Sequence, residues 1–238
     1  MGKKIMLLYM ILLAVARVLE RRPRLNRFTS NGRVYQRDGT WLSFSAKTTK
    51  TDDGHLVALK RRIDPAWDLA AVVDHANGII GDARGGKKSQ SDKELALALA
   101  LPSFLTKLAV RALRYLDECG LLPRALIDGD PLFTSAFIAN LGSIGMDAPF
   151  HHLYEYGNIP LFIAVGAERT ELALVDGAVV ARPVIPFRFS FDERVEDGLY
   201  CLTALQMLQA MLEDPVTAFA PSEAPIRSPH DVVIRIVP

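Results

Sequence analysis

The stretch FSFDERVEDG, Phe189–Gly198, joins an apolar strand-like run to a leucine-rich helical run. It carries a dense group of charged residues, Asp192, Glu193, Arg194, Glu196 and Asp197. Asp192 can pair with Arg194, and Asp197 can occupy the first turn of the helix, where backbone N–H groups and the helix dipole stabilise a carboxylate. Two interpretations of Glu193 remain open, one structural and one chemical.

The residues on both sides of this stretch have the periodicities of strands and a helix. The run that follows, 198–215, has leucines spaced three and four residues apart, which is typical of a helix. The preceding runs are rich in β-branched and aromatic residues and are separated by turns, so we predict strands within 134–142, 159–167, 170–177 and 178–192.

The N-terminal half adds further elements of both kinds. Two strand-like runs flank Asp38-Gly39, and a third follows within 55–63. Residues 65–84 have helical spacing, with Pro65 at the start. No repeat and no linker divides the chain, so we predict one α/β domain with a mixed β-sheet and helices packed on it.

The first twenty residues allow two interpretations. A basic pair, an apolar run and an Ala14-x-Ala16 pair give the outline of a secretory signal. The same residues also fit an amphipathic helix that stops before Pro23.

Residues 94–127 are the most apolar part of the chain. The pattern is helical and interrupted by Pro102, and it places Lys107, Arg111 and Arg114 away from a leucine-rich side. We consider a buried helical hairpin, a partner-binding helix and a membrane-surface helix, so a protein or membrane contact through 94–122 remains open.

Composition excludes several classes of protein. The net charge is +1 and the basic residues are dispersed, so we predict no nucleic-acid partner. Cys119 and Cys201 are far apart without CxxC spacing, which argues against a zinc site and a disulfide framework and favours a cytoplasmic location.

The order of motifs resembles a known catalytic domain. NLGSIG, an AVGA strand, a VDG…ARPV hairpin, FSFDERVEDG and a helix ending in LEDP are similar to the dihydrolipoamide acyltransferases of 2-oxoacid dehydrogenase complexes. The resemblance implies their chloramphenicol acetyltransferase-like two-layer sandwich. It also favours a domain helix over a signal peptide at the N-terminus, and it places the apolar segment 94–127 as an insertion.

The resemblance implies a homotrimer or higher oligomer with active sites between subunits. Acyl-CoA would enter each site as a co-substrate, with no covalently bound cofactor and no metal. In this family a His in the motif His-x-x-x-Asp-Gly is the general base, and a Ser or Thr before NLG donates to the oxyanion.

This sequence departs from the family at both chemically active positions. Asp192, Arg194, Asp197 and Gly198 match the motif, but Glu193 occupies the position of the His. Aligning IANLG with the family's ISNLG places Ala139 at the position of the oxyanion Ser. Thr134 or Ser135 would supply a hydroxyl in another strand register, and the candidate substrate-binding residues are Thr134, Ser135, Asn140 and Arg194.

The two departures have a calculable cost. A Glu is about 2 pKa units less basic than a His, which makes proton removal from a thiol about 3 kcal/mol less favourable. A lost oxyanion donor costs about 2.7–4 kcal/mol. Burial of Glu193 would restore part of this by raising its pKa.

A second candidate base lies in DAPFHHLYEYGN. His151 or His152 can be a catalytic or substrate-binding residue, a metal ligand together with Glu155, or part of an ordinary turn.

These observations support two functions. The first is an acyltransferase that moves an acyl group from acyl-CoA to a thiol, hydroxyl or amine, with Glu193, Asp197, His151 and His152 as candidate catalytic residues. The second is an inactive scaffold or CoA-binding protein of the same fold. We assign residues 1–215 to the acyltransferase-like domain and 216–238 to a Pro-rich tail.

Overall fold

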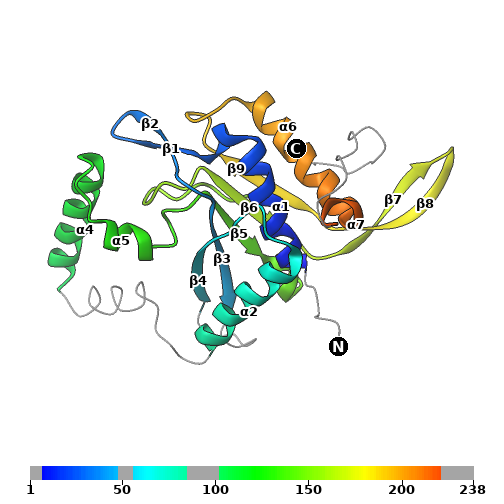
Figure 1. Ribbon diagram of the computed structural model, residues 1–238, viewed down its shortest axis with the longest axis horizontal. Helices are drawn as coiled ribbons and strands as arrows, with labels where there is room; N and C mark the ends of the chain where they lie inside the picture. Colours follow the sequence, from blue (N-terminus) through cyan, green and yellow to red (C-terminus); the bar gives the residue numbers. More distant parts are fainter. Residues whose placement is uncertain (1–6, 48–55, 85–101, 221–238) are drawn as a thin grey trace.

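A five-stranded mixed sheet forms the centre of the molecule (Figure 1). The computed structural model describes residues 7–47, 56–84 and 102–220. The sheet contains β3 Trp41–Lys47, β4 Leu56–Arg62, β5 Ala136–Asn140, β6 Leu161–Val165 and β9 Phe187–Phe191. The strand order is β4-β3-β5-β6-β9. These strands fall within runs that the sequence predicted, and the predicted mixed sheet is confirmed.

Parallel pairing is restricted to the middle of the sheet. β5 pairs in parallel with β3 and β6, whereas β4 and β9 run antiparallel to their neighbours at the two edges. The register pairs Ala139 with Ala164 and Phe191 with Leu161. Because β5 and β9 run in opposite directions, their carboxyl ends lie at opposite ends of β6.

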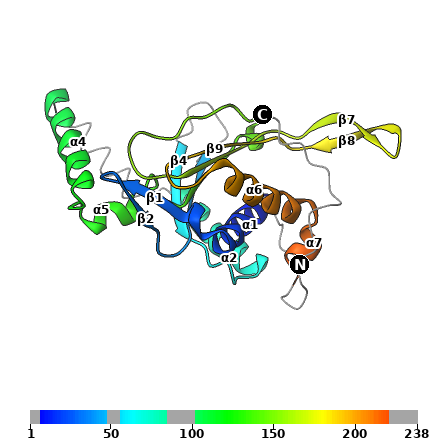
Figure 2. The ribbon, with the colours of Figure 1, turned by 90° about the horizontal axis from the view of Figure 1, so that it is seen from above.

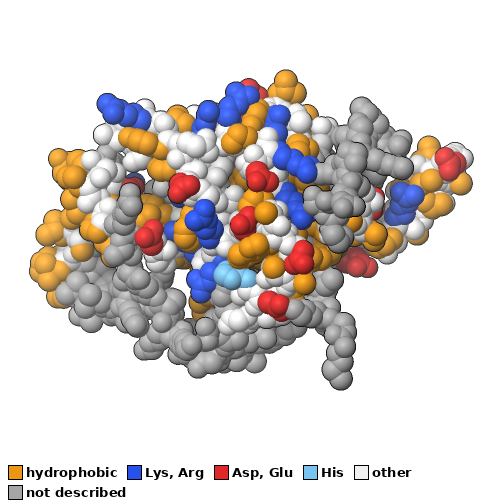
Figure 3. Space-filling model, in the orientation of Figure 1, with side chains coloured by type: hydrophobic (Ala, Val, Ile, Leu, Met, Phe, Trp, Pro, Cys, Tyr) orange, Lys and Arg blue, Asp and Glu red, His pale blue; other side chains and the backbone are white. Residues whose placement is uncertain are grey.

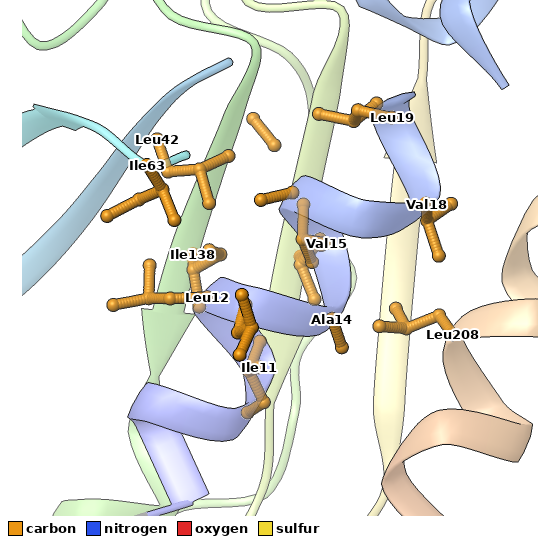
Figure 4. Packing of buried hydrophobic residues seen from close by; sticks show 14 of the residues in the cluster. Ile11, Leu12, Ala14, Val15, Val18, Leu19, Leu42, Ile63, Ile138 and Leu208 are labelled. Carbon is orange, nitrogen blue, oxygen red and sulfur yellow. The ribbon is translucent and has the colours of Figure 1, made fainter. Parts of the chain in front are cut away.

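Three helices cover one face of the sheet (Figure 1). They are α1 Leu7–Arg21, α2 Leu69–Arg84 and α6 Gly198–Glu213. α1 lies between α2 and α6, and its side chains are buried nearly all round, as expected for a helix that is apolar on every side. Figure 4 shows Ile11, Leu12 and Val15 of this helix packed in the core with Ile138 of the sheet. The prediction of a domain helix at the N-terminus is therefore confirmed.

The start of α2 differs from the prediction. The helix begins at Leu69, four residues after Pro65, because the Asp68 carboxylate accepts the backbone N–H of Ala71 at 2.7 Å and ends the preceding turn. The intervening turn is used for a tertiary contact, since the Arg17 guanidinium donates to the carbonyl oxygens of Pro65 and Trp67.

The opposite face of the sheet carries a smaller apolar cluster. Its buried members are Phe137, Ala139, Ala148, Ile159, Phe162 and Ala164. Ala148 and Ile159 belong to the irregular segment 146–160, which connects the end of β5 to β6 and packs on this face. This segment contains no helix or strand, so the three helices and the sheet are the two principal layers of the fold.

Two hairpins extend from these layers. β1 Arg27–Ser30 and β2 Arg33–Gln36 form one, and β7 Arg169–Val175 and β8 Ala178–Val184 form the other. Both hairpins turn through two residues with positive φ, as a tight type I′ turn requires; Asp176 and Gly177 have φ of 50° and 80°. β7 and β8 project from the body of the molecule (Figure 2).

The described part of the apolar segment lies at the other end of the molecule from β7 and β8 (Figures 1 and 2). It contains α4 Ser103–Glu118 and α5 Arg124–Gly129. Phe104, Leu108 and Tyr115 on α4 are 68%, 62% and 67% exposed. No described element covers these three side chains, and the other arm of the predicted hairpin cannot be compared, so the buried-hairpin interpretation stays a prediction. Residues 94–101 lie outside the described residues.

Short helices complete the fold. η1 Pro23–Asn26 follows α1, η2 Leu141–Ile144 follows β5, and α7 Pro215–Ala218 follows α6. The carbonyl oxygen of Ala218 accepts a hydrogen bond from Arg17 at 2.6 Å, so the chain remains attached to the domain at this point. Residues 221–238 of the predicted tail lie outside the described residues. Within the described part of the chain, no helix is long and apolar enough to cross a membrane.

Candidate active site

The turn between β9 and α6 is held by an internal ion pair. Both carboxylate oxygens of Asp192 accept from the Arg194 side chain, at 2.8 and 2.7 Å, and Oδ1 also accepts the backbone N–H of Arg194 at 3.0 Å. Thr29 on β1 donates to Asp192 at 3.5 Å. Burial alone would raise the pKa of Asp192, but the bonds and charge of Arg194 outweigh it and lower the pKa. The predicted Asp192–Arg194 pair is confirmed.

Glu196 connects this turn to the segment after α1. Its carboxylate is largely buried and pairs with Arg24 at 3.0 Å. Arg24 and Arg22 lie over the Tyr200 ring at 4.1 and 3.6 Å from its centre. These contacts fix the start of α6 against η1 and give the basic run after α1 a structural purpose.

Asp197 caps α6. Its Oδ1 accepts the backbone N–H of Tyr200 at 2.9 Å, and this bond is the main cause of the lowered pKa of Asp197. The sequence-based expectation that Asp197 occupies the helix start is confirmed. The Asp of the His-x-x-x-Asp-Gly motif therefore has a structural role in this chain, as the cap of α6.

Glu193 lies on the exposed corner of the same turn. Within the described residues, its carboxylate takes part in no hydrogen bond or ion pair. Val195 two residues later is buried, and the N–H of Val195 donates to the Asp192 carbonyl at 3.0 Å. The turn is therefore anchored on both sides of a side chain that faces outward.

The second half of the predicted site is at the end of β5. Ala139 is buried in the smaller apolar cluster, and Asn140 follows as the last residue of the strand. The glycine of the NLG motif is sterically required, because a Cβ at Gly142 would lie 2.3 Å from the carbonyl oxygen of Gly166. The backbone of the motif is thus retained while its hydroxyl is absent.

The hydroxyls of Thr134 and Ser135 are engaged elsewhere. Thr134 Oγ1 donates to the Trp41 carbonyl at 2.6 Å, and Ser135 Oγ accepts the Trp41 N–H at 3.0 Å. Both side chains are fully buried beside β3. The observed register therefore gives them the role of joining β3 to β5.

His151 and His152 lie on the segment over the smaller cluster. The His151 ring stacks on Phe162 with centres 3.9 Å apart and planes 6° apart. Nδ1 of His151 contacts the His152 carbonyl, and Nδ1 of His152 lies 2.7 Å from the Leu153 carbonyl. In residues 7–47, 56–84 and 102–220, no group of three His, Cys, Asp or Glu side chains is placed to hold a metal ion. Among the interactions of the described residues, no hydrogen bond or ion pair joins either histidine to Glu193.

Glu193 and Ala139 are separated within one chain. Glu193 follows Phe191, which pairs with Leu161 at the start of β6, whereas Ala139 pairs with Ala164 near the end of β6. Ordinary sheet spacings across two strands and along three residues place Phe191 and Ala139 about 14 Å apart. One chain alone does not bring the two halves of the predicted site together.

Two contacts of the turn were not predicted from the sequence. The links from Thr29 to Asp192 and from Arg24 to Glu196 join residues more than 160 positions apart. The only sequence signal was the basic composition of RRPRLNR, which indicated charge without naming a partner.

Comparison with known proteins bears on the fold and family. Residues 134–220 match the model of the 2-oxoacid dehydrogenases acyltransferase (catalytic domain) family. No match was found among curated proteins.

Solved structures of similar fold cover most of this chain. A probable dihydrolipoamide acetyltransferase from Listeria monocytogenes 4b F2365 has 15% identity and a TM-score of 0.63, covering 92% of this chain and 74% of its own. A dihydrolipoamide acetyltransferase from Azotobacter vinelandii has 19% identity and a TM-score of 0.63, with coverages of 91% and 72%. A truncated catalytic core of the 2-oxoacid dehydrogenase multienzyme complex from Thermoplasma acidophilum has 14% identity and a TM-score of 0.56, with coverages of 89% and 76%.

These likenesses confirm the fold class predicted from the sequence. They also confirm the predicted resemblance: residues 134–220 match the catalytic-domain model of the 2-oxoacid dehydrogenase acyltransferases, and the described chain has the fold of the dihydrolipoamide acetyltransferases to which it is similar.

Proposed function

We propose that this protein is a CoA-dependent acyltransferase that assembles as a homotrimer, with Glu193 as the general base. The observation that carries the proposal is the anchored turn of residues 192–198, which presents Glu193 outward on a fixed backbone. Asp192, Glu196 and Asp197 all hold this turn in place, whereas Glu193 is the acidic residue left available to a substrate.

The separation of Glu193 from the end of β5 supports an oligomeric site. An acyl-transfer site needs a base and the groups that contact the thioester within a few ångströms of each other. The β5 end of a second chain would supply Asn140 and the backbone of the NLG motif beside Glu193 of the first.

The proposed reaction is a transfer between two nucleophiles. Glu193 accepts the proton of the acceptor thiol, hydroxyl or amine as the acceptor attacks the thioester carbonyl of acyl-CoA. The tetrahedral intermediate then collapses, the carbon–sulfur bond of the thioester breaks, and the CoA sulfur takes the proton from Glu193. A base in contact with the substrate typically contributes a factor of about 10²–10⁴ in rate.

A second function has its own support. Ala139 provides no oxyanion donor, and the nearby hydroxyls of Thr134 and Ser135 are bonded to β3. An inactive trimeric scaffold or CoA-binding protein is favoured by this loss, which corresponds to about 2.7–4 kcal/mol of transition-state stabilisation.

Turnover of a panel of acyl-CoA esters with thiol, hydroxyl and amine acceptors tests the enzyme proposal. Glu193→Gln is expected to lower kcat by about a hundredfold or more. Glu168→Gln, which removes another exposed carboxylate, is the matched control and should leave kcat unchanged. Equal turnover by wild type and Glu193→Gln would exclude Glu193 as the base.

Restoration variants separate a slow enzyme from a scaffold. Glu193→His combined with Ala139→Ser returns both family side chains to the same backbone, and we expect a gain of about 10⁴-fold or more in kcat. CoA binding by the wild type without turnover of any acyl-CoA would favour the scaffold. Light scattering at micromolar concentration tests the trimer, and a stable monomer would remove the inter-subunit site.

A further inference from the structure

α4 combines exposed apolar and basic surfaces that the proposed acyl transfer does not use. Phe104, Leu108 and Tyr115 lie at intervals of four and seven residues, which places them along one stripe of the helix. All three are exposed. In Figure 3, hydrophobic side chains gather at the end of the molecule where Figure 1 places α4.

Basic side chains border this stripe. Arg111 lies three residues after Leu108, and Lys107 and Arg114 follow the same edge at intervals of four and three. All three are exposed, and the acidic residues of α4, Asp117 and Glu118, are confined to its last turn. The positive charge of the helix is thus collected along one border of its exposed apolar stripe.

We propose that α4 binds the surface of an anionic lipid bilayer. A helix with Phe and Leu on one side and Lys or Arg beside them lies in the interface with its apolar side about 5–10 Å deep. Anionic headgroups attract each nearby Lys or Arg by about 1 kcal/mol, which is a factor of about five in binding. At 16 residues α4 is shorter than the ~20 that span a bilayer, so it lies on the surface.

The charge arrangement favours lipid over a second copy of the chain. An apolar stripe that pairs with itself in a symmetric dimer would bring Lys107, Arg111 and Arg114 of both copies near one another, and like charges at an interface oppose association. An anionic lipid surface instead places negative charge opposite Lys107, Arg111 and Arg114.

The mode of attachment leaves α4 accessible. Its last turn contacts the β1–β2 hairpin, where Ser30 Oγ donates to the Asp117 carbonyl at 3.3 Å. α5 is held to the sheet edge by Lys60, whose Nζ donates to the Ile127 carbonyl at 2.7 Å. The helix is therefore anchored at its carboxyl end while its first three turns extend from the domain (Figure 2).

Flotation of the full chain with lipid vesicles tests the proposal. We expect binding to vesicles containing about 30% phosphatidylserine at low salt, weaker binding to pure phosphatidylcholine, and loss of binding as salt rises. Lys107→Gln/Arg111→Gln/Arg114→Gln should weaken binding by about a hundredfold. Phe104→Ser/Leu108→Ser should weaken it by a similar factor, because two apolar side chains no longer enter the interface.

A matched control uses the other exposed apolar surface. Leu172→Ser/Leu174→Ser changes two equally exposed residues on β7 and should leave vesicle binding unchanged. Circular dichroism and the Tm show that each variant is folded. The proposal is overturned if wild type does not float with phosphatidylserine vesicles, or if the α4 variants bind as well as wild type. It is also overturned if Phe104→Ser/Leu108→Ser lowers the mass in light scattering, since α4 would then join copies of the chain.

Discussion

α1 and α4 are helices of similar length and high apolar content, yet one is enclosed by the domain and the other is exposed. α1 is covered by the sheet on one side and by α2 and α6 on the others, whereas the apolar stripe of α4 faces away from the described elements. The difference lies in the neighbouring elements, because the sheet, α2 and α6 present apolar side chains to α1. Apolar periodicity therefore predicts that a helix forms, whereas its burial depends on which elements pack against it.

The largest expected effect is the loss of a side chain from α1. Leu12→Ala leaves a cavity at a fully buried position and should lower the free energy of unfolding by about 3 kcal/mol. For a domain of this size the Tm should fall by roughly 6–12 °C in a thermal melt followed by circular dichroism. An unchanged Tm would mean that α1 is not part of the core.

The two cysteines test the same contrast between the helices by their rates of chemical labelling. Cys201 is buried in the helical layer on α6, while Cys119 is exposed at the end of α4. Burial raises the pKa of Cys201 to about 11, so that only about 0.1% is thiolate at pH 8. In the single-thiol variants Cys119→Ser and Cys201→Ser, labelling of Cys201 should be at least about a hundredfold slower. Equal rates would show that the helical layer opens freely.

Glu213 at the end of α6 extends the comparison to pH. Burial raises its pKa to about 7, so the folded chain holds a proton that the unfolded chain has lost. The free energy of unfolding should therefore decrease as pH rises from about 4.5 to 7, and the cost is fully present above pH 7.

Glu213→Gln removes this titration. After allowance for solvent screening, we expect its Tm to exceed that of wild type by a few degrees at pH 8 and to match it at pH 4. A Tm difference that is constant with pH would contradict the assignment. Glu168→Gln, on an exposed loop, is the control.

The smallest effect on stability is expected on α4. Leu108→Ala removes an exposed side chain and should change the free energy of unfolding by no more than about 0.5 kcal/mol. A loss comparable to that of Leu12→Ala in the same urea titration would show that α4 is packed, and the contrast between the helices would disappear.

Much of the fold was predictable because the strands and helices carry clear local periodicities. The buried side of α6 was predictable only in part. Leu208 is buried, but Leu199 and Leu202 are exposed, and Cys201, Ala204 and Met211 also face the core. Which side of a helix meets its neighbours depends on the tertiary arrangement, which leucine spacing alone does not contain.

The candidate site also contains local contacts that could be predicted and long-range contacts that could not. Asp197 at the start of α6 and the Asp192–Arg194 pair were predicted because a cap and a two-residue ion pair are local. The bonds of Thr134 and Ser135 to Trp41 were not predicted, since they depend on which strand lies beside β5. The distance between Glu193 and Ala139 likewise follows from strand order, which the sequence alone did not supply.

The enclosure of α1 has a consequence for how the protein is made. Its cover includes α6, and Arg17 bonds to Ala218, which lies 201 positions later in the chain. At typical synthesis rates, roughly 10–40 s separate the emergence of α1 from the ribosome and that of α6. During this interval the nascent chain displays an uncovered apolar helix, which is the kind of segment that a ribosome-associated chaperone retains.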